Sequence, residues 1–189
     1  MRFLTIGFCV GALLVACLIP GEAPAAGEAE IVGLQVFRDP PNLKVSFRIE
    51  NPFTPQMEEA IVSGIPITFR IFLVLETPGL PMMRTNLLDL TFEHSMKYDT
   101  LHNQFQVRRT EFPGETLLTA DYEKAKQWMS EVAGIPIIPL WRLTKAQEYR
   151  LKVKAELSKV RLPLFFRYMF FFVSLWDFET GWAQIEFSY

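Results

Sequence analysis

The sequence predicts a mainly β protein: an antiparallel β-sandwich, or a partly closed barrel, of about nine strands with two short α-helices. Segments in which apolar and polar residues alternate recur along the chain, and turn-forming residues separate them. Only two segments show the helical spacing of apolar residues. The chain has 189 residues, which is enough for one domain with a sizeable core.

The strand pattern is clearest at 43–50, where Leu43, Val45, Phe47 and Ile49 share one face and polar residues share the other. Residues 31–37 precede it across a proline-containing turn, so the two segments are expected to pair. Segment 67–76 is apolar on one face and partly apolar on the other, as in a central strand. We expect further strands at 88–97, 104–108, 137–143, 149–157 and 182–189.

Two short helices are expected between the strands. Thr54 and Pro55 form an N-cap followed by proline at the first helical position, and Gly64 ends this helix. For the second helix we expect a cap at Thr119 and an end at Gly134. The segment Gly-Ile-Pro-Ile begins at both glycines. We interpret it as the same helix-stop chemistry used twice, the alternative being an old duplication of one structural unit.

The N-terminus is expected to direct export. Arg2 is followed by an apolar run without charge, and Ala23-Pro24-Ala25 suits signal-peptide cleavage after Ala25. Residues 1–25 are therefore the predicted signal peptide, 26–30 a spacer and 31–189 a single β-sandwich domain in the periplasm. The alternative is a bacterial lipoprotein, because residues 14–17 resemble a lipobox and Cys17 would then be acylated and anchor the chain to the membrane.

Composition and motifs argue against several kinds of function. The net charge of −2 lacks the basic footprint of a nucleic-acid binder. Both cysteines lie in the targeting segment, so the folded domain has no thiol nucleophile or cysteine-ligated metal. The serine-nucleophile motif Gly-x-Ser-x-Gly and glycine-rich phosphate loops are absent as well. We expect neither an enzyme nor a cofactor.

Residues 162–182 (LPLFFRYMFFFVSLWDFETGW) hold nine of the chain's 26 aromatic residues. Their apolar part, 162–175, contains Arg167 and is shorter than the roughly 20 residues of a membrane span. Both faces of an extended chain would be apolar here, so the run is either core or a docking surface. The candidate binding residues are Phe166, Tyr168, Phe170, Phe172, Trp176, Asp177, Glu179 and Trp182.

The order of motifs resembles an uncharacterised bacterial envelope family, domain of unknown function 4390. The resemblance rests on AIVSGIPITFRI, MKYDTLHNQFQVRR, DYEKAKQW, YRLKVKAEL and the aromatic run, and it covers nearly all of the chain after the targeting segment. None of these motifs is a catalytic signature. The resemblance implies an exported single domain and supplies no established activity.

Three polar groupings have both a functional and a structural interpretation. His94 and His102 would make a zinc site only together, but their positions predict opposite sides of the sheet, so we expect a core histidine and a turn histidine and no metal. Asp177 and Glu179 suit a glycosidase pair or a sugar-binding site flanked by tryptophans, or simply a polar turn.

The third grouping is the stripe Arg150, Lys152 and Lys154. It reads as a solvated strand face or, alternatively, as a surface for anionic lipid head groups. We expect overall an exported, non-enzymatic accessory module that binds another envelope protein. The alternative is a carrier or sensor of an apolar ligand such as a lipid, held by the aromatic run.

Overall fold

A computed structural model describes residues 28–78, 85–158 and 179–189. In these residues the chain forms nine strands, two α-helices and a short 3-10 helix. The elements are β1 (Glu30–Asp39), β2 (Asn42–Glu50), α1 (Pro55–Val62), β3 (Ile67–Glu76), β4 (Asn86–Asp99), β5 (Gln104–Arg109), β6 (Thr116–Thr119), α2 (Tyr122–Ser130), β7 (Glu131–Pro139), η2 (Leu140–Arg142), β8 (Glu148–Leu157) and β9 (Ala183–Ser188).

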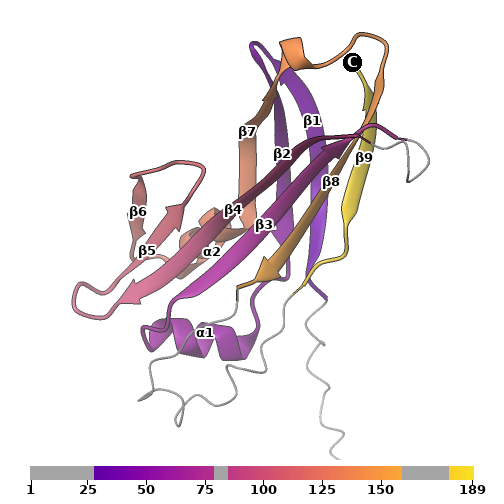
Figure 1. The fold of residues 1–189 in the computed structure, drawn as a ribbon. Coiled ribbons are helices and arrows are strands. Elements are labelled where there is room, and N and C mark those ends of the chain that lie inside the picture. The colour runs from indigo at the N-terminus through magenta and orange to yellow at the C-terminus, as the bar shows by residue number, and fades with distance from the viewer. Residues whose placement is uncertain (1–27, 79–84, 159–178) are drawn as a thin grey trace, which may run out of the picture.

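The strands form two antiparallel sheets that face each other (Figure 1). One sheet has the order β1-β2-β7 and the other the order β6-β5-β4-β3-β8-β9. We call them the three-stranded and the six-stranded sheet. Every neighbouring pair of strands is antiparallel. The predicted antiparallel sandwich is confirmed, and β3 is the expected central strand, flanked by β4 and β8.

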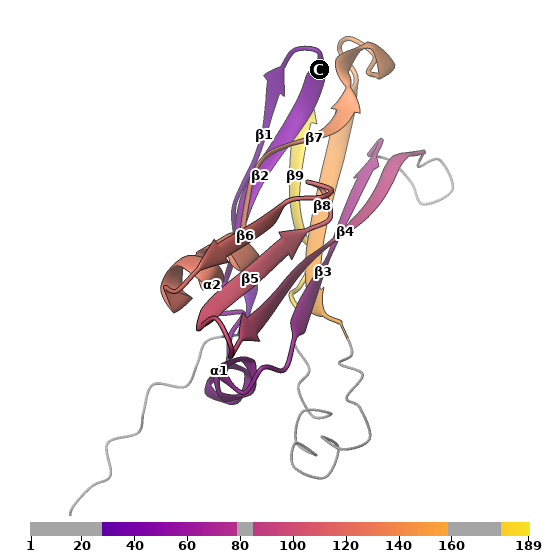
Figure 2. The same cartoon turned by 90° about the vertical axis from the view of Figure 1, so that its left-hand side faces the viewer.

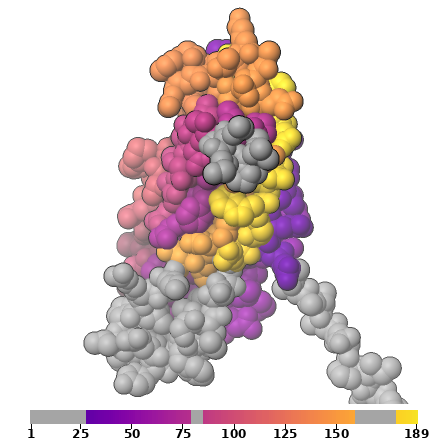
Figure 3. Space-filling view, turned by 45° about the vertical axis from the view of Figure 1, so that its right-hand side comes forward, coloured from indigo at the N-terminus to yellow at the C-terminus, as the bar shows by residue number. Residues whose placement is uncertain are grey.

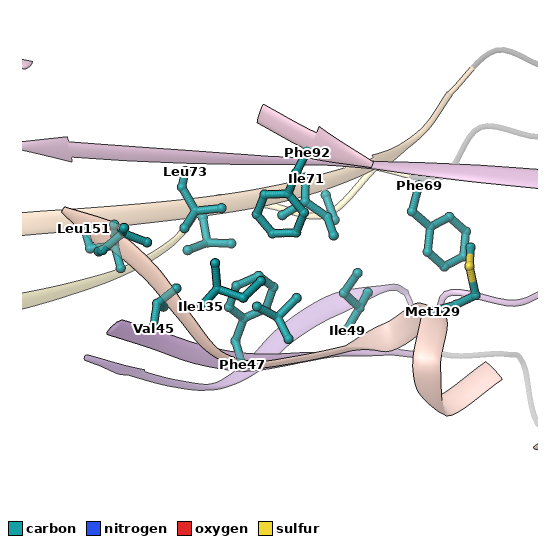
Figure 4. Packing of buried hydrophobic residues seen from close by; sticks show 14 of the residues in the cluster. Val45, Phe47, Ile49, Phe69, Ile71, Leu73, Phe92, Met129, Ile135 and Leu151 are labelled. Carbon is teal, nitrogen blue, oxygen red and sulfur yellow. The ribbon is translucent and has the colours of Figure 1, made fainter. Parts of the chain in front are cut away.

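The core lies between the two sheets (Figure 4). Alternate residues of each inner strand point into it, because side chains on a strand alternate between its two faces. The three-stranded sheet contributes Val45, Phe47 and Ile49, which are at most 4 % exposed. Opposite them lie Ile71 and Leu73 of β3, both fully buried. The alternating pattern of the sequence therefore identifies the residues that are buried between the two sheets.

The sandwich is closed along one side, where β1 and β9 lie next to each other (Figure 3). The Arg38 guanidinium donates a hydrogen bond to the Ser188 carbonyl oxygen at 3.1 Å. The same guanidinium stacks on the Tyr189 ring, 4.7 Å from its centroid. These contacts connect the first strand of one sheet to the last strand of the other.

The first helix follows its prediction. The Thr54 side chain accepts a hydrogen bond from the Met57 backbone N–H, and proline occupies the first turn. Gly64 follows the helix with a φ of 84°, a left-handed conformation that favours glycine. Met57 and Ile61 are buried against the end of the sandwich.

The second helix differs from its prediction at both ends. Its N-cap is Asp121, whose carboxylate accepts from the backbone N–H groups of Glu123 and Lys124, and not Thr119. The helix ends at Ser130, and β7 begins at the next residue. Gly134 therefore does not stop a helix.

Gly134 instead lies within β7, at an irregularity in the pairing of β7 with β2. Its φ is 64°, and its N–H donates to the Ser46 hydroxyl at 2.8 Å. The expectation that Gly-Ile-Pro-Ile marks the same helix-stop chemistry twice is wrong. The first copy follows a helix, whereas the second bends an edge strand, where proline is tolerated.

Two further strand predictions change. Strand β7 covers 131–139 and not 137–143, because residues 140–142 form η2. Strand β6 at the edge of the six-stranded sheet was not predicted, and it has only four residues, too few for a clear alternating pattern. The aromatic run up to residue 178 lies outside the described residues, as does the targeting segment.

Gly134→Ala is expected to lower the free energy of unfolding by about 1 kcal/mol, because a left-handed φ is unfavourable for alanine. A clash is not the cause, since the nearest atom to an added Cβ would be in the Phe37 ring, at 3.8 Å. Gly181→Ala is the matched control: its Cβ would have no heavy atom within 4 Å, and its φ is not left-handed. Urea unfolding of both variants measures the difference, and equal stabilities would contradict the assignment.

Candidate functional site

The described residues contain only part of the predicted binding site. Phe166, Tyr168, Phe170, Phe172, Trp176 and Asp177 lie outside them, and so does Cys17. The two candidates that are described, Glu179 and Trp182, stand at the point where the chain returns to the six-stranded sheet. Neither the pairing of Asp177 with Glu179 nor a cavity lined by the aromatic run is tested.

Glu179 and Trp182 are both held against β8. Glu179 forms an isolated bridge with Glu156, and its carboxylate makes an ion pair with Lys154. Trp182 is half exposed, and the ammonium groups of Lys152 and Lys154 lie 5.6 and 5.9 Å from the centroid of its ring. The lysines and the tryptophan thus form one cation–π cluster on the outer face of the six-stranded sheet.

The predicted basic stripe is paired with carboxylates. Arg150 contacts Glu186 at 2.6 Å and Glu76 at 3.6 Å. Lys152 lies 3.3 Å from the same Glu76, and Lys154 pairs with Glu179. The hydrogen bond to Glu186 raises the pKa of the Arg150 guanidinium above its ordinary value. A stripe that is neutralised residue by residue favours the interpretation of a solvated strand face over that of a lipid-binding surface.

The two histidines are separated as predicted. His94 on β4 is fully buried, whereas the side chain of His102, in the turn between β4 and β5, is 68 % exposed. Nδ1 of His102 lies 2.9 Å from Oδ2 of Asp99. This hydrogen bond lowers the pKa of Asp99 below its ordinary value. In the described part of the chain, no group of three histidine, cysteine, aspartate or glutamate side chains could hold a metal ion.

His94 has a partner that the sequence analysis missed. Its Nε2 lies 2.8 Å from Oε1 of Glu111, whose side chain is only 7 % exposed, and its Nδ1 lies 2.9 Å from the Met129 carbonyl oxygen. A carbonyl oxygen only accepts, so Nδ1 carries a proton. One further proton must then lie between Nε2 and Glu111. The pair joins β4 to the turn after β5 and to the end of α2.

A groove of about 390 Å³ opens beside this pair, on the side of the sandwich opposite to the contact of β1 with β9. Its lining comes from both sheets: Leu90, Thr91 and Phe92 of β4, Thr110, Glu111 and Phe112 after β5, and Ile135 and Pro136 of β7. Glu111 is the only ionisable residue among them. Its Oε2 atom is buried and has no hydrogen-bond partner among the described residues.

Sequence patterns contain a partial signal for this site. The position of His94 between Phe92 and Met96 on the inner face of β4 predicts burial, and a buried imidazole requires hydrogen-bond partners. Nothing in the spacing identifies Glu111 as that partner, because it follows the end of β5 and belongs to no periodic segment.

None of the helices in the described ranges is long and apolar enough to cross a membrane.

His94→Ala is expected to destabilise the protein by roughly 3 kcal/mol, because it leaves the Glu111 carboxylate buried without its partner. The exposed pair at His102 is the matched control, and His102→Ala should cost less than about 1 kcal/mol. Glu111→Gln should cost less than His94→Ala, since its amide N–H can donate to Nε2 of a neutral His94. Denaturant unfolding compares the three variants, and similar losses for His94→Ala and His102→Ala would contradict the buried pair.

The comparisons with known proteins agree with the resemblance drawn from the motifs. A family model described as "Domain of unknown function (DUF4390)" matches residues 26–186, nearly the whole chain. The match begins before β1 and ends within β9, so it includes both sheets. No curated protein matches the chain, and no solved structure does. The chain belongs to the DUF4390 family, whose function is unknown.

Proposed function

We propose that this protein is an exported, non-enzymatic accessory module of the cell envelope that binds another envelope protein through its aromatic run. The N-terminal sequence supports export, with an apolar stretch followed by small residues at the expected cleavage site. The protein would act by presenting an apolar surface and would require no cofactor.

The observation that carries this proposal is the place at which the aromatic run enters the fold. Strand β8 ends at Leu157 and β9 begins at Ala183, and these two strands pair with each other at the edge of the six-stranded sheet. The aromatic run is therefore an insertion between two neighbouring strands. Connections between paired antiparallel strands are usually only a few residues long, and long ones are often functional.

The composition of the core supports the same proposal. The buried cluster between the sheets includes residues of β3, β4, β5 and β8 in the six-stranded sheet, together with β2 and β7. Phe69, Leu73 and Val153 are fully buried within it. The described strands fill this space by themselves. In the proposed function the aromatic run therefore contacts a partner and is not needed to complete this core.

The experiment that tests the proposal is crosslinking in intact cells, followed by purification of the tagged full-length protein and mass spectrometry of proteins and lipids. One dominant envelope protein is expected, and it should be lost when Phe166, Phe170 and Phe172 are changed to serine. Leu101→Ser is the matched control, because Leu101 is 88 % exposed in the turn after β4 and lies outside the aromatic run.

Other outcomes distinguish the alternatives. A lipid that co-purifies in stoichiometric amount, without a protein partner, would support the carrier and reject the module. An unchanged protein partner in the triple serine variant would show that the aromatic run is not the binding surface.

A further inference from the structure

Strand β4 is longer than β5, the strand that pairs with it on the side away from β3. It runs over 14 residues, from Asn86 to Asp99, and pairs with β3 along almost its whole length. Strand β5 pairs only with the second half, from His94 to Asp99. Figure 2 shows β4 continuing past the end of β5. Among the described residues, positions 86–92 of β4 therefore have a neighbouring strand, β3, on one side only. We call the unpaired side of these residues the open edge.

The direction of the backbone N–H and C=O groups at the open edge follows from the hydrogen bonds between β4 and β5. The Glu93 carbonyl oxygen accepts from the Thr110 N–H at 2.9 Å, so Glu93 directs its backbone groups toward β5. In an antiparallel ladder every second residue faces the same side. Asp89 and Thr91 therefore direct their N–H and C=O groups toward the open edge, about 7 Å apart along the strand. Regular pairing with β3 ends at Leu88, where the register shifts, so the rule is not extended to Leu87.

The ladder ends at Glu93 for a structural reason. The Glu93 N–H binds the Thr110 hydroxyl at 2.8 Å and not a carbonyl oxygen. The next residue, Glu111, turns inward to His94 and takes the chain away from the sheet. The buried pair of His94 and Glu111 thus fixes the point at which β5 leaves β4, and the open edge begins there.

The groove described above lies directly under this edge. Leu90 and Phe92 form one wall and Ile135 and Pro136 of β7 the other. The inward-facing residues of an added strand would enter it. Apolar side chains match most of the lining, and the Oε2 atom of Glu111 requires a hydrogen-bond donor.

We propose that the open edge of β4 binds an extended segment of a partner protein as an additional strand. The segment would place apolar side chains, and one side chain that donates a hydrogen bond to Glu111, in the groove. A polypeptide fits best because only another backbone supplies alternating N–H and C=O groups at this spacing. The site includes no residue of the aromatic run, so its test can fail without the proposed function failing.

The test uses a photoreactive p-benzoylphenylalanine placed at Asp89 or at Lys97 of the full-length chain in intact cells. Both positions are exposed on the same face of β4, but Lys97 is paired with Gln106 of β5, whereas Asp89 borders the open edge. We expect a crosslink to a second polypeptide from Asp89 and none from Lys97. Mass spectrometry should place the crosslink within one segment of that polypeptide.

Substitutions at the open edge separate strand addition from accidental proximity. Thr91→Pro removes one of the edge donors and should reduce the Asp89 crosslink by roughly tenfold or more, whereas Thr91→Val keeps the N–H and should leave it unchanged. Proline is tolerated where the N–H of an edge strand faces outward. Asp89→Pro, with the photoreactive residue moved to the exposed position Thr91, serves as a second edge variant should Thr91→Pro fail to fold.

Four results would overturn the proposal: no crosslink from Asp89, equal crosslinks from Asp89 and Lys97, a crosslink unaffected by proline in a folded variant, or a crosslink only to another copy of this chain. The last result would identify the open edge as a self-association surface.

Discussion

Apolar packing between the two sheets holds this protein together. The described residues contain no cysteine, and the inner faces of β2 and β3 are almost completely buried against each other. Each such leucine, isoleucine or phenylalanine contributes roughly 1.5–3 kcal/mol when removed from water. The helices, the edges and the groove are all positioned relative to this layer, because it lies between the two sheets over their whole contact.

The fold was predictable where one face of a segment is core and the other is solvent. The alternation in 43–50 and the helix start at Thr54 and Pro55 are both local signals, and both are confirmed. The error at Gly134 arises because the same local signal serves two structures. A glycine followed by Ile-Pro follows α1 at Gly64 but bends β7 at Gly134, and only the pairing with β2 distinguishes the two.

The candidate site was less predictable, for a physical reason. Burial of His94 follows from its place in the alternating pattern, but its partner Glu111 is brought to it by the turn after β5, and turns carry no periodicity. The open edge was likewise not predictable. The length of a strand can be predicted from the alternating pattern, but the number of its residues that pair with the next strand cannot. Hydrogen-bond partners and strand edges are properties of the topology, whereas burial is a property of the local pattern.

The strand order of the smaller sheet has a consequence for how the chain folds. Its middle strand, β2, pairs on one side with β1, its neighbour in sequence, and on the other with β7, so that Ser46 binds Gly134, 88 residues further along. An isolated two-stranded hairpin is only marginally stable in water. The β1–β2 hairpin can therefore be completed by β7 only after most of the chain has been synthesised. Pairing between strands so far apart in the sequence is slow. During that interval the apolar face of the hairpin is exposed, so the β1–β2 hairpin needs protection from aggregation until β7 has been made.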